Sequence, residues 1–170
     1  RRRKAESDGQ RNPGRGSPSA LANRCALRPS LELSPVPVMP RCLALILCKA
    51  AVHHRSSGQW DLLGAFWELE MPSFPGNVGP FAVWVALLNG AGRAPMALRI
   101  EHLTDRLEED LVVEIRFTME FTDPRVVRVY WALINELALD SPGHYRVALS
   151  AHGDALVQGY FIARHAPPPS

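Results

Sequence analysis

Histidine is the first residue type in this sequence that could do chemistry, because its imidazole can ligate a metal ion or act as a general base. His53 and His54 are adjacent, and four more histidines are scattered along the chain. Zinc sites favour ligand pairs separated by two or three residues, and no His or Cys pair has that spacing. Adjacent residues of a strand point apart, so we predict no metal site. The alternative is a convergence of His53 and His54 with His152 at one end of the fold.

Cysteine is the second such residue type, as a nucleophile or as half of a disulfide. Cys42 and Cys48 lie six residues apart in one apolar run, so a strand would separate them by about 20 Å, beyond disulfide reach. We interpret them as buried structural thiols, since a nucleophilic cysteine needs an exposed, electropositive setting. Three unpaired cysteines, with Cys25 as the third, indicate a reducing compartment, and we predict a cytoplasmic protein.

Other catalytic signatures are missing from the sequence. It contains no Gly-x-Ser-x-Gly nucleophile turn, and the glycine-bearing segment 90–93 lacks the Lys-Ser or Lys-Thr pair of a phosphate loop. The acidic run 108–110 is typical of a solvated turn and lacks the alternating oxygen ligands of a calcium loop. We therefore predict no catalytic residue, no cofactor and no enzymatic activity.

Aromatic side chains give the remaining indication of a binding surface. Trp60 borders the polar turn 56–59, and Phe74 lies between two prolines in a loop, where an exposed ring suits a partner. Together with His53 and His54, these rings form our candidate partner or ligand surface. The alternative for Phe74 is burial beneath the fold, which large apolar rings favour.

These residues need a fold to position them, and the first 38 residues do not supply one. Residues 1–38 are rich in Arg, Gly, Pro and Ser and show no apolar periodicity, which is typical of a disordered leader. Strand-like sequence follows Met39 at once, so we predict that the native chain starts there and that residues 1–38 are not native. The alternative is a basic arm, because the chain begins RRRK.

From residue 41 onwards, apolar runs alternate with turn signals. Residues 81–88 are apolar on both faces, which indicates a central strand. Residues 111–121 alternate with period 2, and their predicted inward row is Leu111, Val113, Ile115, Phe117, Met119 and Phe121. We predict strands at 41–52, 59–70, 81–88, 96–103, 111–121, 126–139, 145–149 and 155–163. A helix over 130–139 is the alternative there, because that stretch has good helix formers.

This pattern predicts an all-β protein: an antiparallel β-sandwich of about eight strands, Ig-like in general architecture. The sandwich domain spans residues 39–166, and residues 167–170 form a disordered tail, because a run of prolines cannot extend a sheet. Strands 96–103 and 111–121 form a hairpin. Its predicted register places Arg99 opposite Glu114, since opposite charges stabilise facing positions.

Charge argues against nucleic acid as a partner. The chain has a net charge of +2, but residues 1–40 hold eight basic and three acidic residues, a net +5, which leaves −3 for the rest. No apolar run reaches the roughly 18 residues of a membrane span, so we predict no membrane partner. The segment MPRCLALILCKAA resembles a signal peptide only in part, because Lys49 ends a short apolar run.

Several motifs resemble a family of small bacterial single-domain proteins of unknown function. They are a Leu-x-Gly-x-Phe strand, a Phe-Pro loop and a terminal Pro-Gly-x-Tyr hairpin, found here at 62–66, 74–75 and 142–145. The resemblance covers residues 39–163 and implies a β-sandwich that opens directly into its first strand. It implies no established activity and no catalytic residue.

We therefore expect a non-enzymatic protein-interaction or assembly module, with a protein partner or self-association through a sheet face or edge. The alternative is a β-sandwich that binds a small molecule or a carbohydrate with its loop aromatics. An exposed, contiguous apolar patch would favour the first function, and a concave site with convergent polar groups would favour the second.

Overall fold

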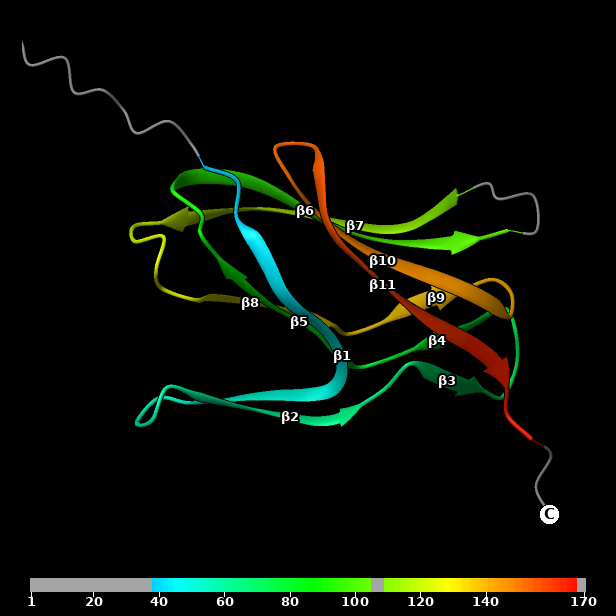
Figure 1. The fold of residues 1–170 in the computed structure, drawn as a ribbon. Helices are drawn as coiled ribbons and strands as arrows, with labels where there is room; N and C mark the ends of the chain where they lie inside the picture. Colours follow the sequence, from blue (N-terminus) through cyan, green and yellow to red (C-terminus); the bar gives the residue numbers. More distant parts are fainter. Residues whose placement is uncertain (1–37, 105–108, 168–170) are drawn as a thin grey trace, which may run out of the picture. The chain divides into compact units, whose positions relative to one another are not determined.

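The computed structural model describes residues 38–104 and 109–167, and the fold of this part of the chain is all β. It contains no helix long and apolar enough to cross a membrane. The predicted leader lies outside the described residues except for Val38, whose backbone pairs with Ala91. Residues 168–170 of the predicted tail lie outside them as well. The strands (Figure 1) are β1 (Arg41–His54), β2 (Gln59–Ala65), β3 (Glu68–Met71), β4 (Gly76–Val78), β5 (Phe81–Leu88), β6 (Gly92–Leu103), β7 (Glu109–Phe121), β8 (Arg128–Ile134), β9 (Leu137–Leu139), β10 (Gly143–Ala151) and β11 (Asp154–His165).

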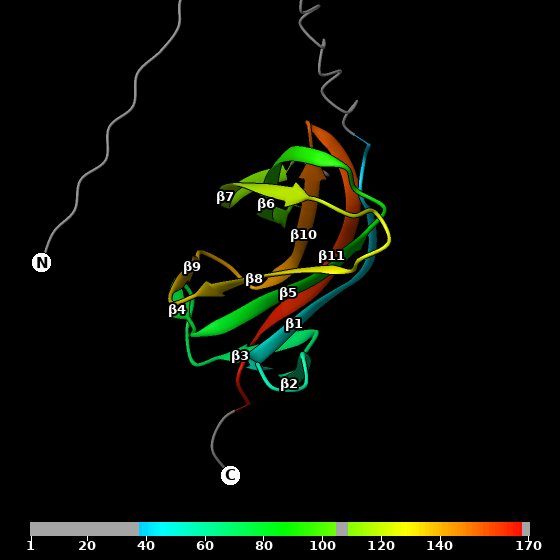
Figure 2. The same ribbon diagram turned by 90° about the vertical axis from the view of Figure 1, so that its left-hand side faces the viewer.

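Nine of these strands form two sheets. The first has the order β2–β1–β5–β8, the second has the order β3–β11–β10–β6–β7, and β4 pairs with β9 in a small third sheet. All neighbours are antiparallel except β3 and β11, which are parallel. Figure 2 shows β1, β5 and β8 in one layer, with β6, β7 and β10 in the other. The prediction of an antiparallel β-sandwich is confirmed.

The core lies between the two sheets and consists of alternate residues from each strand. Val83, Val85 and Leu87 of β5 are fully buried, as are Leu98 and Ile100 of β6. Burial of each such side chain contributes about 1.5–3 kcal/mol. The largest buried ring, Tyr145, stacks on Phe161 at 5.2 Å, and its hydroxyl donates to the carbonyl of Ser141 at 2.6 Å. This tyrosine therefore buries its ring without leaving its hydroxyl unpaired.

Strand β5 is central, as its two-sided apolar sequence predicts. It pairs with β1 along one edge and with β8 along the other. While Val83 and Val85 face the core, Trp84 lies on the opposite, outer face and pairs with Ile46 and Trp131 on the neighbouring strands. The outer face of this sheet is therefore apolar at its centre.

The hairpin of β6 and β7 has the predicted register, with Arg99 opposite Glu114. The predicted inward position of Leu111 is wrong, because more than half of its side chain is exposed. Ile100 pairs with Val113 but Glu101 pairs with Leu111, so Val112 is an extra residue in β7. Such a bulge reverses the alternation of side chains beyond it, and Leu111 moves to the outer face.

Two of the predicted strands are each divided between two sheets. In 59–70, the chain leaves β2 and enters β3 of the other sheet at Phe66 and Trp67. The N–H of Phe66 donates to Leu47, and the carbonyl of Trp67 accepts from Ile162, so this corner is bonded to both sheets. In 126–139, a bend at Asn135 separates β8 from β9.

Secondary structure also differs from the sequence prediction at two further places. Residues 130–139 contain no helix, because β8 pairs along its whole length with β5, and this pairing overrides the local helix propensity. The loop that carries Phe74, residues 71–80, contains a short strand, β4, which pairs with β9. Together with the two divided strands, β4 raises the number of strands from the predicted eight to eleven in the described residues.

Candidate functional site

Three of the four predicted site residues meet in the first hairpin. Figure 1 shows the end of β1 turning back with β2, so that this hairpin runs beside β5 and β8. The imidazole of His53 stacks on the indole of Trp60, with ring centroids 4.7 Å apart. His54 lies on the opposite side of the strand, where its Nε2 is 2.7 Å from Oδ2 of Asp61. Both histidines therefore have partners within the hairpin.

Trp60 belongs to an aromatic cluster that joins β2 to β5 and β8. Its ring lies edge-on to Trp84 and to Trp131, each at 6.4 Å between centroids. The aromatic cluster thus comprises His53, Trp60, Trp84 and Trp131. The sequence pattern alone does not predict this cluster, because nothing in it indicates that the hairpin folds back over the outer face of the sheet. The buried Nε1 of Trp84 has no hydrogen-bond partner in the described residues, so the cluster is held by packing alone.

Phe74, the fourth predicted residue, lies elsewhere. Its ring is half-buried against the core and meets His165 edge-on at 5.1 Å. Among the described residues it contacts no ring of the aromatic cluster. This placement corresponds to the alternative of burial rather than to an exposed ring on a partner surface.

The histidines do not assemble a metal site in the described residues. No group of three His, Cys, Asp or Glu side chains there could hold a metal ion. The convergence of His53 and His54 with His152 does not occur, because His152 lies at the β10–β11 turn and lines a different surface. The thiols of Cys42 and Cys48 are free, and burial raises the pKa of both. A raised pKa keeps a thiol protonated and unreactive near neutral pH.

The edge of the first sheet at β8 is an apolar surface. Trp131 and Leu133 project from its outer face, with 44 % and 49 % of their surface exposed. Val126 and Val127, which precede the strand, are exposed too. On the inner side, Tyr130 stacks flat on Phe117 of β7 at 3.7 Å between centroids, which holds β8 in place at the side of the sandwich.

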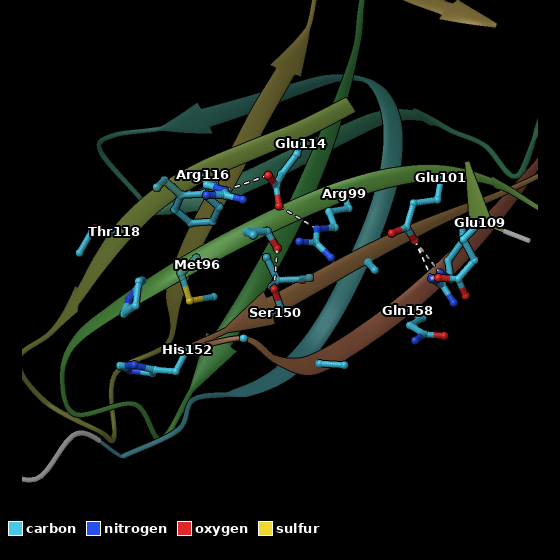
Figure 3. Close-up of a pocket in the computed structure, with 18 residues that line it drawn as sticks. Met96, Arg99, Glu101, Glu109, Glu114, Arg116, Thr118, Ser150, His152 and Gln158 are labelled. Atoms are coloured by element: carbon cyan, nitrogen blue, oxygen red, sulfur yellow. Dashed lines mark hydrogen bonds and ion pairs between the residues drawn. The ribbon is translucent and has the colours of Figure 1, made fainter. Parts of the chain in front are cut away.

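The outer face of the second sheet carries a hollow of about 750 Å³, which we call the sheet groove (Figure 3). It crosses β6, β7, β10 and the start of β11. Its floor consists of small side chains on adjacent strands, since Ala97 pairs with Ser150 and Ser150 pairs with Ala155. Ala148 continues the floor along β10. Charged side chains from neighbouring positions stand around this floor and form the rim.

One end of the sheet groove carries two arginines and one glutamate. Nε of Arg99 and Nε of Arg116 each lie 2.8 Å from a different oxygen of Glu114. The hydrogen bond from Arg99, followed by that from Arg116, lowers the pKa of Glu114 below its ordinary value. These three side chains carry a net charge of +1. We call them the basic end of the groove.

The other end carries one arginine and two glutamates. Arg146 donates from Nε and Nη2 to Oε2 of Glu101, at 2.9 and 2.7 Å. Its Nη2 also lies 2.5 Å from Oε2 of Glu109. Glu101 is the one charged residue buried in the described residues, at 6 % exposure, whereas half of the Glu109 side chain is exposed. This acidic end has a net charge of −1, and Figure 3 shows it across the groove from Arg116.

A second, smaller cavity of about 460 Å³ lies at the end of β6 and β7. Its lining includes His102, Asp110, Asp140 and Tyr145. The imidazole of His102 stacks on Tyr145 at 4.6 Å, so this histidine is engaged in packing. The sheet groove is the larger of these two cavities and carries more charged side chains.

Two apposed sheets, joined by a chain that crosses between them at corners, define the protein as a β-sandwich with an apolar edge and a charged concave face. The chain belongs to a family of unknown function, DUF6941, whose model matches residues 43–161. The predicted resemblance to a family of unknown function is confirmed, while the bacterial origin and the motifs from which it was drawn stay predictions.

A comparison with curated proteins finds no match. Among solved structures, the chain is similar to an immunoglobulin-like protein from Pseudomonas aeruginosa, with a TM-score of 0.37 and 12 % sequence identity. The similarity covers 75 % of this chain and 98 % of that one.

Proposed function

We propose that this chain is a non-enzymatic assembly module that pairs with a second copy of itself through the free edge of β8. The observation that carries the proposal is the lack of protective charge on this strand. Edge strands are normally blunted by charged side chains, prolines or bulges, because their free N–H and C=O groups recruit other strands. β8 has Arg128 at its first position and six uncharged residues after it.

The other edge strands of the two main sheets are protected. β3 carries Glu68 and Glu70 in four residues, and β7 carries charged side chains along its length. β2 carries Asp61, and the positive φ of 62° at Gly64, near its end, departs from extended β geometry. This contrast between β8 and the three other edges supports β8 as the pairing edge.

The sequence of β8 suits pairing with itself. Antiparallel pairing about a twofold axis at Trp131 aligns all seven residues, because residue 128 then faces residue 134 of the second copy. On the outer face, Val129 faces Leu133 of the second copy and the two copies of Trp131 meet at the centre. Tryptophan is the residue type that contributes most per residue to interfaces, especially near their centre.

The alternative function, carbohydrate binding by loop aromatics, has less support. A carbohydrate platform needs an aromatic face open to the ligand, but Trp60 is in contact with three other rings and Phe74 packs against the core. The free thiols are consistent with our prediction of a reducing, cytoplasmic location and with a role that requires no nucleophile.

The test is the solution mass measured by light scattering over a range of about 5 to 200 µM, since association depends on concentration. We expect a dimer that dissociates on dilution. Leu133→Glu should abolish it, because pairing would bury a carboxylate from each copy, at a cost of about 2 kcal/mol or more. Leu63→Glu is the matched control, because Leu63 is equally exposed, at 53 %, on the opposite edge of the same sheet.

Three results would overturn the proposal. They are a monomer at every concentration, a dimer that survives Leu133→Glu, or a dimer that Leu63→Glu disrupts equally. Thermal unfolding of each variant establishes that the fold is intact. A fall in solution mass from dimer to monomer can then be assigned to the changed β8 edge rather than to unfolding.

A further inference from the structure

The sheet groove has the size and construction of a small-molecule site. Its volume of about 750 Å³ falls in the range of roughly 300 to 1,000 Å³ that is usual for ligand pockets. The depth comes from Ala97, Ala148, Ser150 and Ala155, which are short where the surrounding side chains are long. A ligand on this floor would lie within reach of the charged groups of both ends.

The basic end has unused hydrogen-bond donors. Arg99 and Arg116 each contact Glu114 through Nε, and neither guanidinium makes a further hydrogen bond or ion pair within the described residues. The terminal Nη groups of both are therefore available to a ligand. Because Glu114 holds the two guanidiniums from one side, they are already oriented, which reduces the entropy lost on binding. Planar guanidinium groups match the geometry of a carboxylate.

The acidic end has an unused acceptor. Arg146 is nearly buried and is shared between Glu101 and Glu109, so one cation faces two carboxylates. Glu109 contributes one oxygen to this contact and is half-exposed towards the solvent. A cationic group that approached Glu109 would neutralise the remaining negative charge of this end.

The bulge at Val112 is what creates the acidic end. With strict alternation from Glu114, Glu109 would point to the inner face of β7. The extra residue instead places it on the outer face, where it reaches Arg146 of β10. The backbone of Glu109 lies opposite Leu103, but its carboxylate and that of Glu101 both contact Nη2 of Arg146 and so lie side by side. Glu101 is two residues from Arg99 along β6, a backbone distance of about 7 Å, and we take this as the approximate spacing of the two ends.

We propose that the sheet groove binds a small ammonium–carboxylate zwitterion, with its carboxylate at Arg99 and Arg116, its ammonium group at Glu109, and the two charges about 7 Å apart. This site is independent of pairing at β8 and lies on the other sheet. A zwitterion of this length complements both ends at once, whereas a simple anion or cation leaves one end uncompensated.

The test uses three probes with the same six-carbon chain: 6-aminohexanoate, hexanoate and hexylammonium. Binding is followed by amide chemical shifts in two-dimensional NMR spectra of the full chain. We expect saturable binding of 6-aminohexanoate, with the largest shifts at Ala97, Ala148 and Ser150. Each singly charged probe should bind about tenfold more weakly, because it loses one charge-assisted contact.

Two variants separate the ends of the groove. Arg116→Gln should weaken binding of 6-aminohexanoate and hexanoate about tenfold and leave binding of hexylammonium unchanged. Glu109→Gln should weaken binding of 6-aminohexanoate and hexylammonium about tenfold and leave binding of hexanoate unchanged. Arg93→Gln is the control, because Arg93 is exposed on the same strand as Arg99 but does not line the groove. It should leave the affinity unchanged.

The proposal is overturned if 6-aminohexanoate gives no saturable shifts, or if hexanoate binds as tightly as the zwitterion. Equal weakening by Arg93→Gln would show a general charge effect rather than a site, and would overturn it too. Because Arg116 and Glu109 lie at the surface of the groove, both variants should retain the dispersed spectrum of the folded protein, which the same measurement checks.

Discussion

Replacement of Arg146 by methionine should destabilise the protein strongly, because it leaves the buried Glu101 without a counter-charge. The side chains of Glu101 and Arg146 are only 8 % and 16 % exposed, and two hydrogen bonds join them. Removing one partner of a fully buried ion pair costs about 3–5 kcal/mol. Since Arg146 also reaches the half-exposed Glu109, where water screens the charge, we expect about 2–3 kcal/mol.

The assay is urea unfolding at pH 7 and fixed protein concentration, with Arg116→Met as the matched control. Arg116 makes an ion pair of similar length on the same sheet, but its side chain is 76 % exposed. The control should leave the free energy of unfolding close to that of the wild type, because surface ion pairs contribute little to stability.

A double variant tests the physical cause. Adding Glu101→Gln to Arg146→Met removes the uncompensated charge and should recover about 1–2 kcal/mol of the loss. If Arg146→Met costs no more than Arg116→Met, or if the double variant is the least stable of all, then the pairing of Glu101 with Arg146 is not what stabilises this face of the sheet.

Two further predictions concern titratable groups. Hydrogen bonds from Arg99 and Arg116 hold the pKa of Glu114 below its ordinary value, so its stabilising effect is complete at neutral pH and is lost as the pH falls through the folded-state pKa. The difference in melting temperature between the wild type and Glu114→Gln should therefore shrink below about pH 4, and a constant difference would contradict this. Cys48 is fully buried and burial raises its pKa, so in a variant that carries Cys25→Ser and Cys42→Ser this thiol should react with a disulfide reagent at pH 8 only as fast as the protein unfolds. Rapid labelling of the folded protein would refute this.

Much of the fold could be predicted from the sequence, because in several strands the local pattern of side chains agrees with the way the strand pairs in the sheet. The two-sided apolar run 81–88 predicts a central strand, and β5 lies between β1 and β8. The alternation of 111–121 and the charges of Arg99 and Glu114 together predict the register of β6 and β7, which the structure confirms. In these elements, side-chain chemistry on each face specifies one arrangement.

Corners and hairpin folding were not predictable, because they depend on which sheet each half of a strand joins. The run 59–70 has the propensity of one strand, yet its halves pair with β1 and β11 in different sheets. The sequence analysis grouped Trp60 with His53 and His54 in one candidate surface, and the first hairpin brings Trp60 into contact with His53. Its contacts with Trp84 and Trp131 could not be predicted, since they need the hairpin to fold back over β5 and β8.

The sheet groove depends on two β-bulges, which a strict alternation of side chains along each strand does not predict. One bulge, at Val112, brings Glu109 to the outer face, and a second, at Leu156, brings Ala155 there, since Ser150 pairs with Ala155 and Leu149 pairs with Val157. Without these extra residues, the acidic end would lose its exposed carboxylate and the floor would lose a small side chain. The two bulges cost regular backbone pairing at separate places, and both change the same surface. That coincidence is the reason to test this face of the sheet, and not the aromatic rings of the loops, for a small ligand.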